Sequence, residues 1–359
     1  MTLDRLSRNP YPIYERLQRE EPVSWIESLG MWFVTRRKQV LNVLLDEETF
    51  TVHSPSSLLE DTFGPMMLSR DGAEHTRLRA PFEAPFQSRS LQTTCAPFIR
   101  GAAHALIDYF AADRHTDLVT AFSDPLALAT VTRVLNLPPD PQIRTWYNAF
   151  AAALANFGGD FGTRERGRIA AREFKEFIRG HFNESEEFIS GALLIIFGGL
   201  ETTSAMLSNT IWALLRHPAQ FAEVRRNPDL IRPAIEEALR WESPVQTCTR
   251  HVTRAASLEG IALQPGEIVQ CMIGAANRDE AFFPRPAEFD ITRRNAGEHL
   301  AFARGRHYCL GASLARLEGE IGLGILFDRL PGLRLDAMRP SAPQGHEFRS
   351  PVTLCVNWD

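Results

Sequence analysis

A cysteine near the end of the chain has neighbours that could keep its sulfur ionised. Cys309 lies in the stretch HLAFARGRHYCLGASLARLE, between Gly305 and Gly311 and just before a helical pattern. Three cationic side chains precede it: Arg304, Arg306 and His307. The first N–H groups of the predicted helix and these cations would favour thiolate over thiol. Such a thiolate can act as a nucleophile or as an axial metal ligand.

These two chemistries need different surroundings. A nucleophilic cysteine needs a histidine base within reach, and the proximity of His307 in sequence does not supply that geometry. A haem ligand needs N–H donors, a tight turn and cations for the propionates, and the stretch around Cys309 offers all three. The residues alone leave a third reading open, in which the cysteine is incidental to a helix N-terminus.

A second stretch, FGGLETTSAML, lies inside a long predicted helix. Gly198 and Gly199 each cost a helix interior about 1 kcal/mol relative to alanine, which a helix accepts for close packing or for room. The Thr202 hydroxyl can bond the carbonyl of Gly198 and bend the helix. We therefore expect a locally opened helix with Glu201 and Thr202 beside the opening. The alternative is an ordinary glycine-rich helix crossing.

Two further pairs of residues have helical spacing. Glu237 and Arg240 stand at i, i+3 before a proline stop, and His75 and Arg79 stand at i, i+4. Taken alone, the first pair predicts a surface ion pair of a few tenths of a kcal/mol and the second a solvated basic face.

The elements that must position these residues are mainly helical. Apolar spacing predicts helices over 96–112, 141–157, 164–182, about 183–216, 227–244 and 310–329. The long helix is expected to begin near Asn183, with Glu186 completing a capping pattern. A hairpin is predicted around Ser28–Gly30, and short strands over 245–275 and after Pro331. With no repeat or linker, residues 1–359 read as one domain, mainly α with a minor β portion.

The overall composition limits the class of protein. The 359 residues carry a net charge of -5, so no global charge points to nucleic acid or to an anionic membrane. The longest apolar run, Ala192–Leu200, is too short to cross a bilayer, and no signal peptide is visible. Five widely spaced cysteines without a C-x-x-C argue against a disulfide scaffold or a zinc ribbon. We expect a cytoplasmic protein.

The pattern F-x-x-G-x-x-x-C-x-G at Phe302, Gly305, Cys309 and Gly311 resembles the haem-binding loop of the cytochrome P450 family. The resemblance covers nearly the whole chain and is closest to soluble bacterial-type members. It implies a cytochrome P450 fold, a single haem-thiolate domain, in which Cys309 is the axial ligand of haem b (iron protoporphyrin IX).

The resemblance also implies roles for the other residues. Glu201 and Thr202 would relay protons to dioxygen. Glu237 and Arg240 would form a buried structural pair, often joined in the family by an arginine where this chain has Glu288; Arg285 and Arg293 are the possible substitutes. The propionates of the haem would be bound by four donors: His75, Arg79, Arg250 and His307.

The sequence departs from the family pattern at two places. Ala303 stands where glycine is common, so it is strained if that position needs a positive φ. The chain is also a few tens of residues short, and the stretch FIRGHFNESEEFIS before the long helix looks truncated. This predicts a more open distal cleft, or a partner that covers it.

By resemblance, the chain is a haem-thiolate monooxygenase that hydroxylates or otherwise oxidises an apolar small molecule. No flavin or Fe–S motif is visible, so electrons should come from a separate ferredoxin or flavodoxin and its reductase, docked on a basic surface. That surface would comprise Arg77, Arg304, Arg306 and Arg316. Pocket walls are expected from Leu58–Met67, Leu194–Gly198, Val245–Cys248 and the region of Phe348.

Three other functions stay open at this point. The first is haem chemistry of another kind: peroxide-driven oxidation, coupling or rearrangement. The second is a non-catalytic haem-binding or sensor protein. The third is a hydrolase with a cysteine nucleophile.

Overall fold

A computed structural model of the chain describes residues 3–54, 57–154 and 159–359. Helices dominate these residues and strands are short. The helices are α1 (Leu3–Arg8), α2 (Tyr11–Glu20), α3 (Arg37–Leu45), α4 (Leu58–Phe63), α5 (Gly72–Glu83), α6 (Ser88–Ser90), α7 (Ala96–Phe110), α8 (Asp124–Val134), α9 (Gln142–Leu154), α10 (Phe161–Arg179), α11 (Glu186–Arg216), α12 (Pro218–Arg226), α13 (Ile231–Trp241), α14 (Ile273–Ala276) and α15 (Ala312–Arg329).

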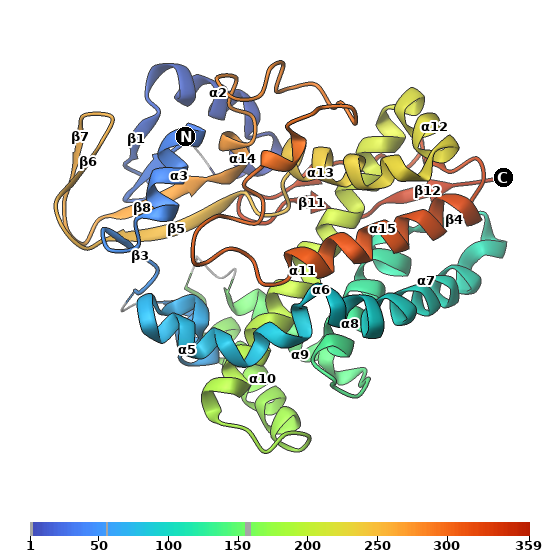
Figure 1. The fold of residues 1–359 in the computed structure, drawn as a ribbon, viewed down its shortest axis with the longest axis horizontal. Helices are drawn as coiled ribbons and strands as arrows, with labels where there is room; N and C mark the ends of the chain where they lie inside the picture. Colours follow the sequence, from blue (N-terminus) through green and yellow to red (C-terminus); the bar gives the residue numbers. More distant parts are fainter. Residues whose placement is uncertain (1–2, 55–56, 155–158) are drawn as a thin grey trace.

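The main sheet has the strand order β1-β2-β8-β5-β3, in which β2 and β8 are parallel and the other neighbours antiparallel. It gathers at the left of Figure 1, beside the helical part of the molecule. The strands are β1 (Val23–Ile26), β2 (Met31–Val34), β3 (Phe50–Thr51), β4 (His115–Asp117), β5 (Thr247–Val252), β6 (Ala256–Leu258), β7 (Ile261–Leu263), β8 (Ile268–Met272), β9 (Arg334–Leu335), β10 (Pro343–Gln344), β11 (Ser350–Pro351) and β12 (Cys355–Asn357).

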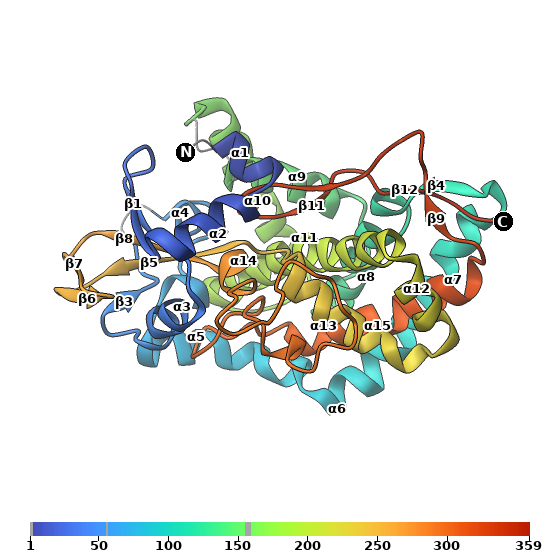
Figure 2. The same cartoon turned by 90° about the horizontal axis from the view of Figure 1, so that it is seen from above.

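Helix α11 runs through the middle of the molecule (Figure 2). Its first half packs into an apolar cluster with α9 and α10, and its second half into another with α7, α13 and α15. By length and composition α11 could cross a membrane, but most of its residues are buried inside the fold. Its hydrophobicity is therefore that of a core helix.

The start of α11 differs from the sequence-based prediction. Ser185, and not Asn183, caps the helix, because its hydroxyl accepts a hydrogen bond from the N–H of Phe188 at 3.2 Å. Glu186 closes no capping box; its carboxylate binds Lys175 at 2.6 Å and Arg179, both on α10. An acidic residue in the first turn therefore joins the two helices.

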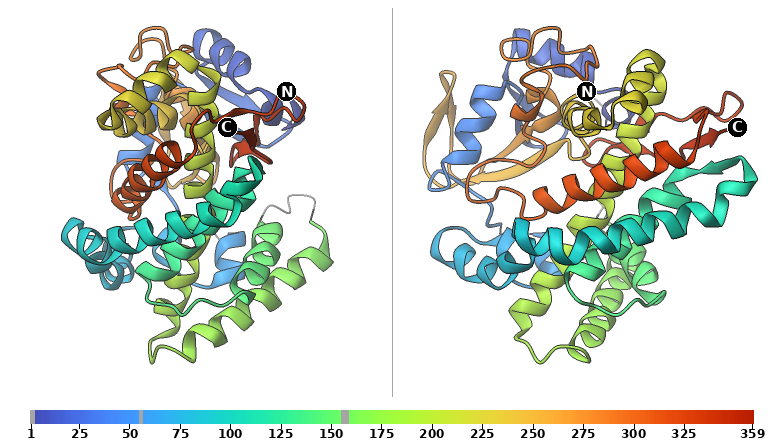
Figure 3. Two further views of the ribbon diagram at one scale, coloured as in Figure 1. Left: turned by 90° about the vertical axis from the view of Figure 1, so that its right-hand side faces the viewer. Right: turned by 45° about the vertical axis from the view of Figure 1, so that its right-hand side comes forward.

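The predicted truncation before α11 is wrong. Helix α10 is continuous from Phe161 to Arg179, and it packs against α9 and α11. Figure 3 shows α9 and α10 as a pair of helices projecting at the bottom of both views. Residues 180–185 connect α10 directly to α11. Because the helices on both sides are complete, the prediction of a more open distal cleft is wrong as well.

Most other predicted elements are confirmed. The hairpin of β1 and β2 turns at Ser28–Gly30, where Gly30 takes a φ of 63°. The helices predicted over 96–112, 164–182, 227–244 and 310–329 correspond to α7, α10, α13 and α15. The helix predicted over 141–157 corresponds to α9, and the part of it beyond residue 154 lies outside the described residues.

The predicted pair Glu237 and Arg240 is a buried ion cluster, since both side chains are completely buried. Two hydrogen bonds of 2.7 Å join them, and Arg293 Nε lies 3.1 Å from Glu237 Oε1. Arg293 is therefore the third member, whereas Arg285 pairs with Glu288 at the surface. The surface-pair alternative is wrong, because every charge in this cluster has a partner.

One buried carboxyl group has no charged partner among the described residues. Glu318 on α15 is buried, and its side-chain neighbour is the Thr130 hydroxyl. Burial raises the pKa of Glu318 to about 8, although the contact with Thr130 acts to lower it. The side chain is therefore mainly protonated at neutral pH, which avoids an uncompensated charge inside the protein.

Replacing Arg293 by methionine should destabilise the holoprotein by about 1–3 kcal/mol, because Glu237 loses a charged hydrogen-bond donor inside the protein. Arg285→Met is the matched control; its exposed pair should contribute less than about 1 kcal/mol. Denaturant unfolding followed at the haem absorbance measures both. Equal losses at the two positions would contradict the role assigned to Arg293.

Replacing Glu318 by glutamine should stabilise the protein in a pH-dependent way. The folded protein holds the Glu318 proton up to about pH 8, and the unfolded chain releases it near the ordinary glutamate pKa. Stability of the natural protein therefore falls as pH rises between these two values. Melting temperatures of the two proteins should coincide near pH 4 and diverge toward pH 8. Asp328→Asn, an exposed change on the same helix, should show no such divergence.

Candidate active site: a cavity between Cys309 and the central helix

A cavity of about 310 Å³ lies between the Cys309 loop and α11. Its walls come from α5, α11, β5, the loop before α15 and α15 itself, and they are mainly apolar. The candidate residues that line it are His75, Arg79, Thr202, Phe302, His307, Cys309 and Gly311. The fold therefore brings together, around one cavity, candidate residues from three separate parts of the sequence.

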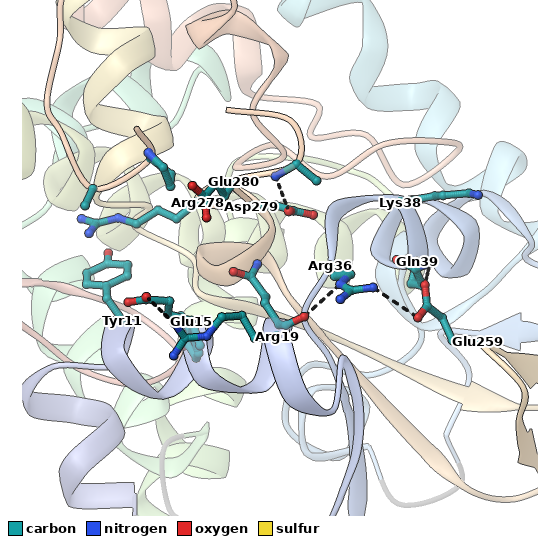
Figure 4. A pocket seen from close by; sticks show the side chains of 15 residues that line it. Tyr11, Glu15, Arg19, Arg36, Lys38, Gln39, Glu259, Arg278, Asp279 and Glu280 are labelled. Atoms are coloured by element: carbon teal, nitrogen blue, oxygen red, sulfur yellow. Dashed lines mark hydrogen bonds and ion pairs between the residues drawn. The ribbon is translucent and has the colours of Figure 1, made fainter. Parts of the chain in front are cut away.

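A larger cleft of about 580 Å³ lies elsewhere, between α2, α3 and the segment 278–287. Figure 4 shows that charged side chains line it. Many of these charges have partners: Arg36 lies 3.5 Å from Glu259, and the Arg278 guanidinium stacks 3.3 Å from the centre of the Tyr11 ring. No candidate residue lines this cleft. The smaller cavity is the candidate active site.

The loop before α15 turns the cysteine toward the cavity. The N–H of Cys309 donates to the carbonyl of Phe302 at 3.0 Å, which closes the turn. Gly305 has a φ of 79°, and a Cβ there would lie 2.8 Å from the carbonyl oxygen of Leu44. Ala303 has a φ of 57°, so the predicted positive φ is confirmed and alanine carries the strain.

Gly311 has a different role from Gly305. Its φ of -80° is open to any residue. A Cβ at this position would lie 3.9 Å from Cys309 Sγ and 4.0 Å from the Phe86 ring. Glycine here keeps the space beside the sulfur open, as close approach of a flat ligand requires.

The surroundings of the sulfur are partly as predicted. Cys309 is exposed at the cavity wall. Desolvation acts to raise the pKa of its thiol, and the N–H groups of Gly311 and Ala312 and the charges of Arg79 and Arg316 act to lower it. The stabilised thiolate stays a prediction. Coordination to a metal would deprotonate the thiol outright.

A cluster of hydrogen-bond donors lies at one edge of the cavity. The rings of His75 and His307 are 4.4 Å apart, and Arg79 donates to the carbonyl of Tyr308 at 2.9 Å. Burial, then the charges of His307 and Arg79, lower the pKa of His75 to about 4, so its imidazole is neutral at neutral pH. Anionic groups placed here would find donors on all three side chains.

One acidic residue of this cluster was missed in the sequence. Asp71, just before α5, accepts a hydrogen bond from His307 Nε2 at 2.8 Å and from the N–H of Val52 at 3.0 Å. His307 can therefore offer only its other ring nitrogen to a propionate. The sequence shows that Asp71 lies just before a helix, but no local pattern predicts its contact with His307, 236 positions away.

Of the four predicted propionate donors, Arg250 is the one outside the wall of the cavity. It is buried on β5 and donates to the carbonyl of Thr249 at 2.8 Å, and it does not line the cavity. Because side chains alternate along a strand, Arg250 shares its face of β5 with Cys248, which does line the cavity. Its role at a propionate stays a prediction.

The two glycines of α11, Gly198 and Gly199, have different roles. A Cβ on Gly199 would lie 2.7 Å from Val131 on α8, whereas one on Gly198 would meet nothing within 4 Å. Gly199 serves close packing and Gly198 leaves room. The Thr202 hydroxyl donates to the carbonyl of Gly198, as predicted. The helix is nevertheless continuous here, so the expected opening is not seen.

Glu201 faces away from this wall. Its carboxylate Oε2 accepts a hydrogen bond of 2.9 Å from the hydroxyl of Tyr147 on α9, and it does not line the cavity. Burial is the main cause that raises the pKa of Glu201. No local pattern in the sequence predicts a contact between residues 54 positions apart.

The predicted pocket walls are largely confirmed. Wall residues from the three predicted segments are Met67, Leu194, Ile195, Gly198, Val245 and Cys248. The fourth predicted wall is wrong, because Phe348 does not line the cavity. The centre of its ring lies 6.1 Å from that of Phe197.

The predicted basic docking surface is mostly neutralised by ion pairs. Arg77 binds Glu187, Arg306 binds Glu47 and Arg316 binds Glu236, each with a contact of 2.7 Å. Arg316 is also nearly buried. The separate arginines therefore do not form one free cationic patch.

The cavity fits a haem on grounds internal to the structure. A flat apolar ring system matches the walls around Phe86, Phe302 and Leu314, and two carboxylates would find donors in His75, Arg79 and His307. Cys309 would bind the iron, and Thr202 on α11 lines the same cavity.

Comparison with known proteins supports the same assignment. The family described as "Cytochrome P450" matches residues 183–331. The chain is 33% identical over 368 residues to the biotin biosynthesis cytochrome P450 of Bacillus subtilis (strain 168), covering 91% of each protein. It is 32% identical to the cytochrome P450 monooxygenase PikC of Streptomyces venezuelae, covering 91% of this chain and 85% of PikC.

Solved structures agree over the full length. The structure of P450BioI with an acyl carrier protein ligated to hexadec-9Z-enoic acid has a TM-score of 0.90 at 31% identity, covering 99% of this chain and 100% of that one. CYP109E1 of Bacillus megaterium with testosterone has a TM-score of 0.89 at 26% identity. This coverage leaves no room for a truncated domain. The chain belongs to the cytochrome P450 family of haem-thiolate monooxygenases.

Proposed function

We propose that the protein oxidises an apolar small organic molecule, typically by hydroxylation, using dioxygen and electrons from a separate ferredoxin or flavodoxin and its reductase. The observation that carries the proposal is the placement of Cys309 and Thr202 on opposite walls of one apolar cavity. A cytoplasmic location fits this dependence on separate electron carriers.

The roles of the residues follow from their positions. When bound, haem would supply the iron chemistry that activates dioxygen. Cys309 would hold the iron through its sulfur. His75, Arg79 and the second ring nitrogen of His307 would bind the propionates and so orient the cofactor. The Thr202 hydroxyl, next to the open space at Gly198, orients water for delivery of protons, and Glu201 supplies them.

The substrate is an apolar molecule held against the walls from α11 and β5. The apolar lining supports this class. Solved structures of similar proteins hold ligands with large apolar parts: an acyl chain on a carrier protein for P450BioI, and testosterone and corticosterone for CYP109E1. These ligands support the class and do not fix the compound.

The alternatives differ in what they require of these residues. Peroxide-driven oxidation, coupling and rearrangement need no relay through Glu201 and Thr202, and a sensor needs no electron donor. A hydrolase needs a histidine base that activates Cys309, but the Nε2 atom of His307 is bonded to Asp71. The geometry favours dioxygen activation over each of these.

The proposal predicts a thiolate-ligated haem whose oxidation chemistry depends on Thr202. The reduced protein with carbon monoxide should show a strongly red-shifted Soret band, which Cys309→Ser should abolish and Cys355→Ser, in a distant strand, should retain. With a substrate chosen by its low- to high-spin shift, Thr202→Ala should lower the yield of product per NAD(P)H by about tenfold or more, whereas Thr202→Ser should retain most of it.

Unchanged product yield in Thr202→Ala would favour the peroxide-driven alternative. A colourless protein, or an unchanged carbon monoxide spectrum in Cys309→Ser, would overturn the haem-thiolate assignment itself.

A further inference from the structure

The two polar residues of the relay lie on different faces of α11. Positions 194, 198 and 202 follow the cavity wall at intervals of four, whereas Phe197, Glu201 and Ser204 follow another face. Thr202 lines the cavity, but the Glu201 carboxyl group is directed to α9. In this conformation Glu201 cannot deliver a proton to the cavity without rotating its side chain.

The partner of Glu201 is Tyr147, one residue of the projecting helix pair in Figure 3. Its hydroxyl donates to Glu201 Oε2 at 2.9 Å. Burial and the nearby Glu201 charge raise the pKa of Tyr147 above its ordinary value, so the phenol keeps its proton and acts as a donor only. The centre of the Tyr147 ring lies 5.3 Å from that of Phe150 and 6.2 Å from that of Phe197. These contacts fix the position of the Tyr147 hydroxyl beside Glu201.

A second link joins the same helices without using Glu201. Arg144, one turn before Tyr147, binds Asp124 at the start of α8, and Ser204, one turn after Glu201, binds the other oxygen of Asp124. The position of α9 therefore does not depend on the Tyr147 hydroxyl. Removing that hydroxyl should release Glu201 and leave the helices in place.

We propose that Tyr147 is a positioning residue that holds the Glu201 carboxyl group outside the cavity, so that Glu201 must leave the phenol before it can serve Thr202. This inference rests on the proposed function. Glu201 then gives its proton toward water at Thr202, and the carboxylate regains a proton from solvent on the side of α9.

The test uses Tyr147→Phe in the holoprotein, since phenylalanine keeps the ring contacts and removes only the oxygen. Tyr109→Phe is the matched control, because that tyrosine is 92% exposed. The first readout is the infrared carbonyl band of protonated Glu201, assigned by its loss in Glu201→Gln. Without the donor, the carboxyl group should titrate about one pH unit higher and its band should shift to higher frequency.

The second readout is the pH profile of dioxygen consumption driven by a surrogate ferredoxin and its reductase. In Tyr147→Phe the alkaline limb of the profile should move up by the same amount as the infrared titration, because Glu201 keeps its proton to higher pH. A purely structural role of Tyr147 would lower the rate at every pH and would not move the limb. The carbon monoxide spectrum should match that of the natural protein.

The outcomes separate this inference from the proposed function. If Tyr147→Phe shifts neither the Glu201 band nor the profile, the positioning role is overturned while the relay stands. If the band shifts but Glu201→Gln leaves the rate and its pH profile unchanged, the relay itself is overturned. Parallel shifts in Tyr147→Phe, with none in Tyr109→Phe, support the inference.

Discussion

The position of one sulfur atom depends on a short backbone turn. The hydrogen bond from the Cys309 N–H to the Phe302 carbonyl closes this turn, and two residues with positive φ, Ala303 and Gly305, make it possible. Gly305 also lies against the backbone of Leu44, so no larger residue fits. A ligand for a metal on the cavity side requires this turn, and the chain accepts local strain at Ala303 to form it.

The turn is held in place by the buried ion cluster behind it. Glu237 and Arg240 belong to α13, but their hydrogen bonds reach the carbonyls of Asn277, Pro286 and Glu288 and the N–H of Asp290. A long segment without regular structure thus gains fixed points along its length. Such a cluster does little for net stability compared with apolar packing, but it specifies one arrangement of the segment that leads to Cys309.

Sequence patterns were informative where the physical cause is local. Helix periodicity predicts the residue ranges of α7, α13 and α15, and the spacing of glycines around Cys309 predicts the turn. Contacts distant in sequence needed the structure: it selects Arg293 over Arg285 as the third ionic partner, and it shows Asp71 beside His307 and Tyr147 beside Glu201. The supposed truncation failed for a related reason, since a shorter loop can join complete helices without loss of either one.

The cavity also shows that the cofactor is part of the electrostatic design of the fold. The polypeptide gathers His75, Arg79 and His307 at one edge of the cavity, where Asp71 binds His307 and Glu83 lies 3.5 Å from Arg79. Glu318, another residue of the cavity wall, is buried mainly in protonated form. Burial of such polar groups costs free energy because they lose their hydration. The propionates of a haem would offer acceptors to the donors at this edge. The same residues that select the cofactor therefore make the folded state more stable when it is bound, which links cofactor binding to folding through a single set of hydrogen-bond donors.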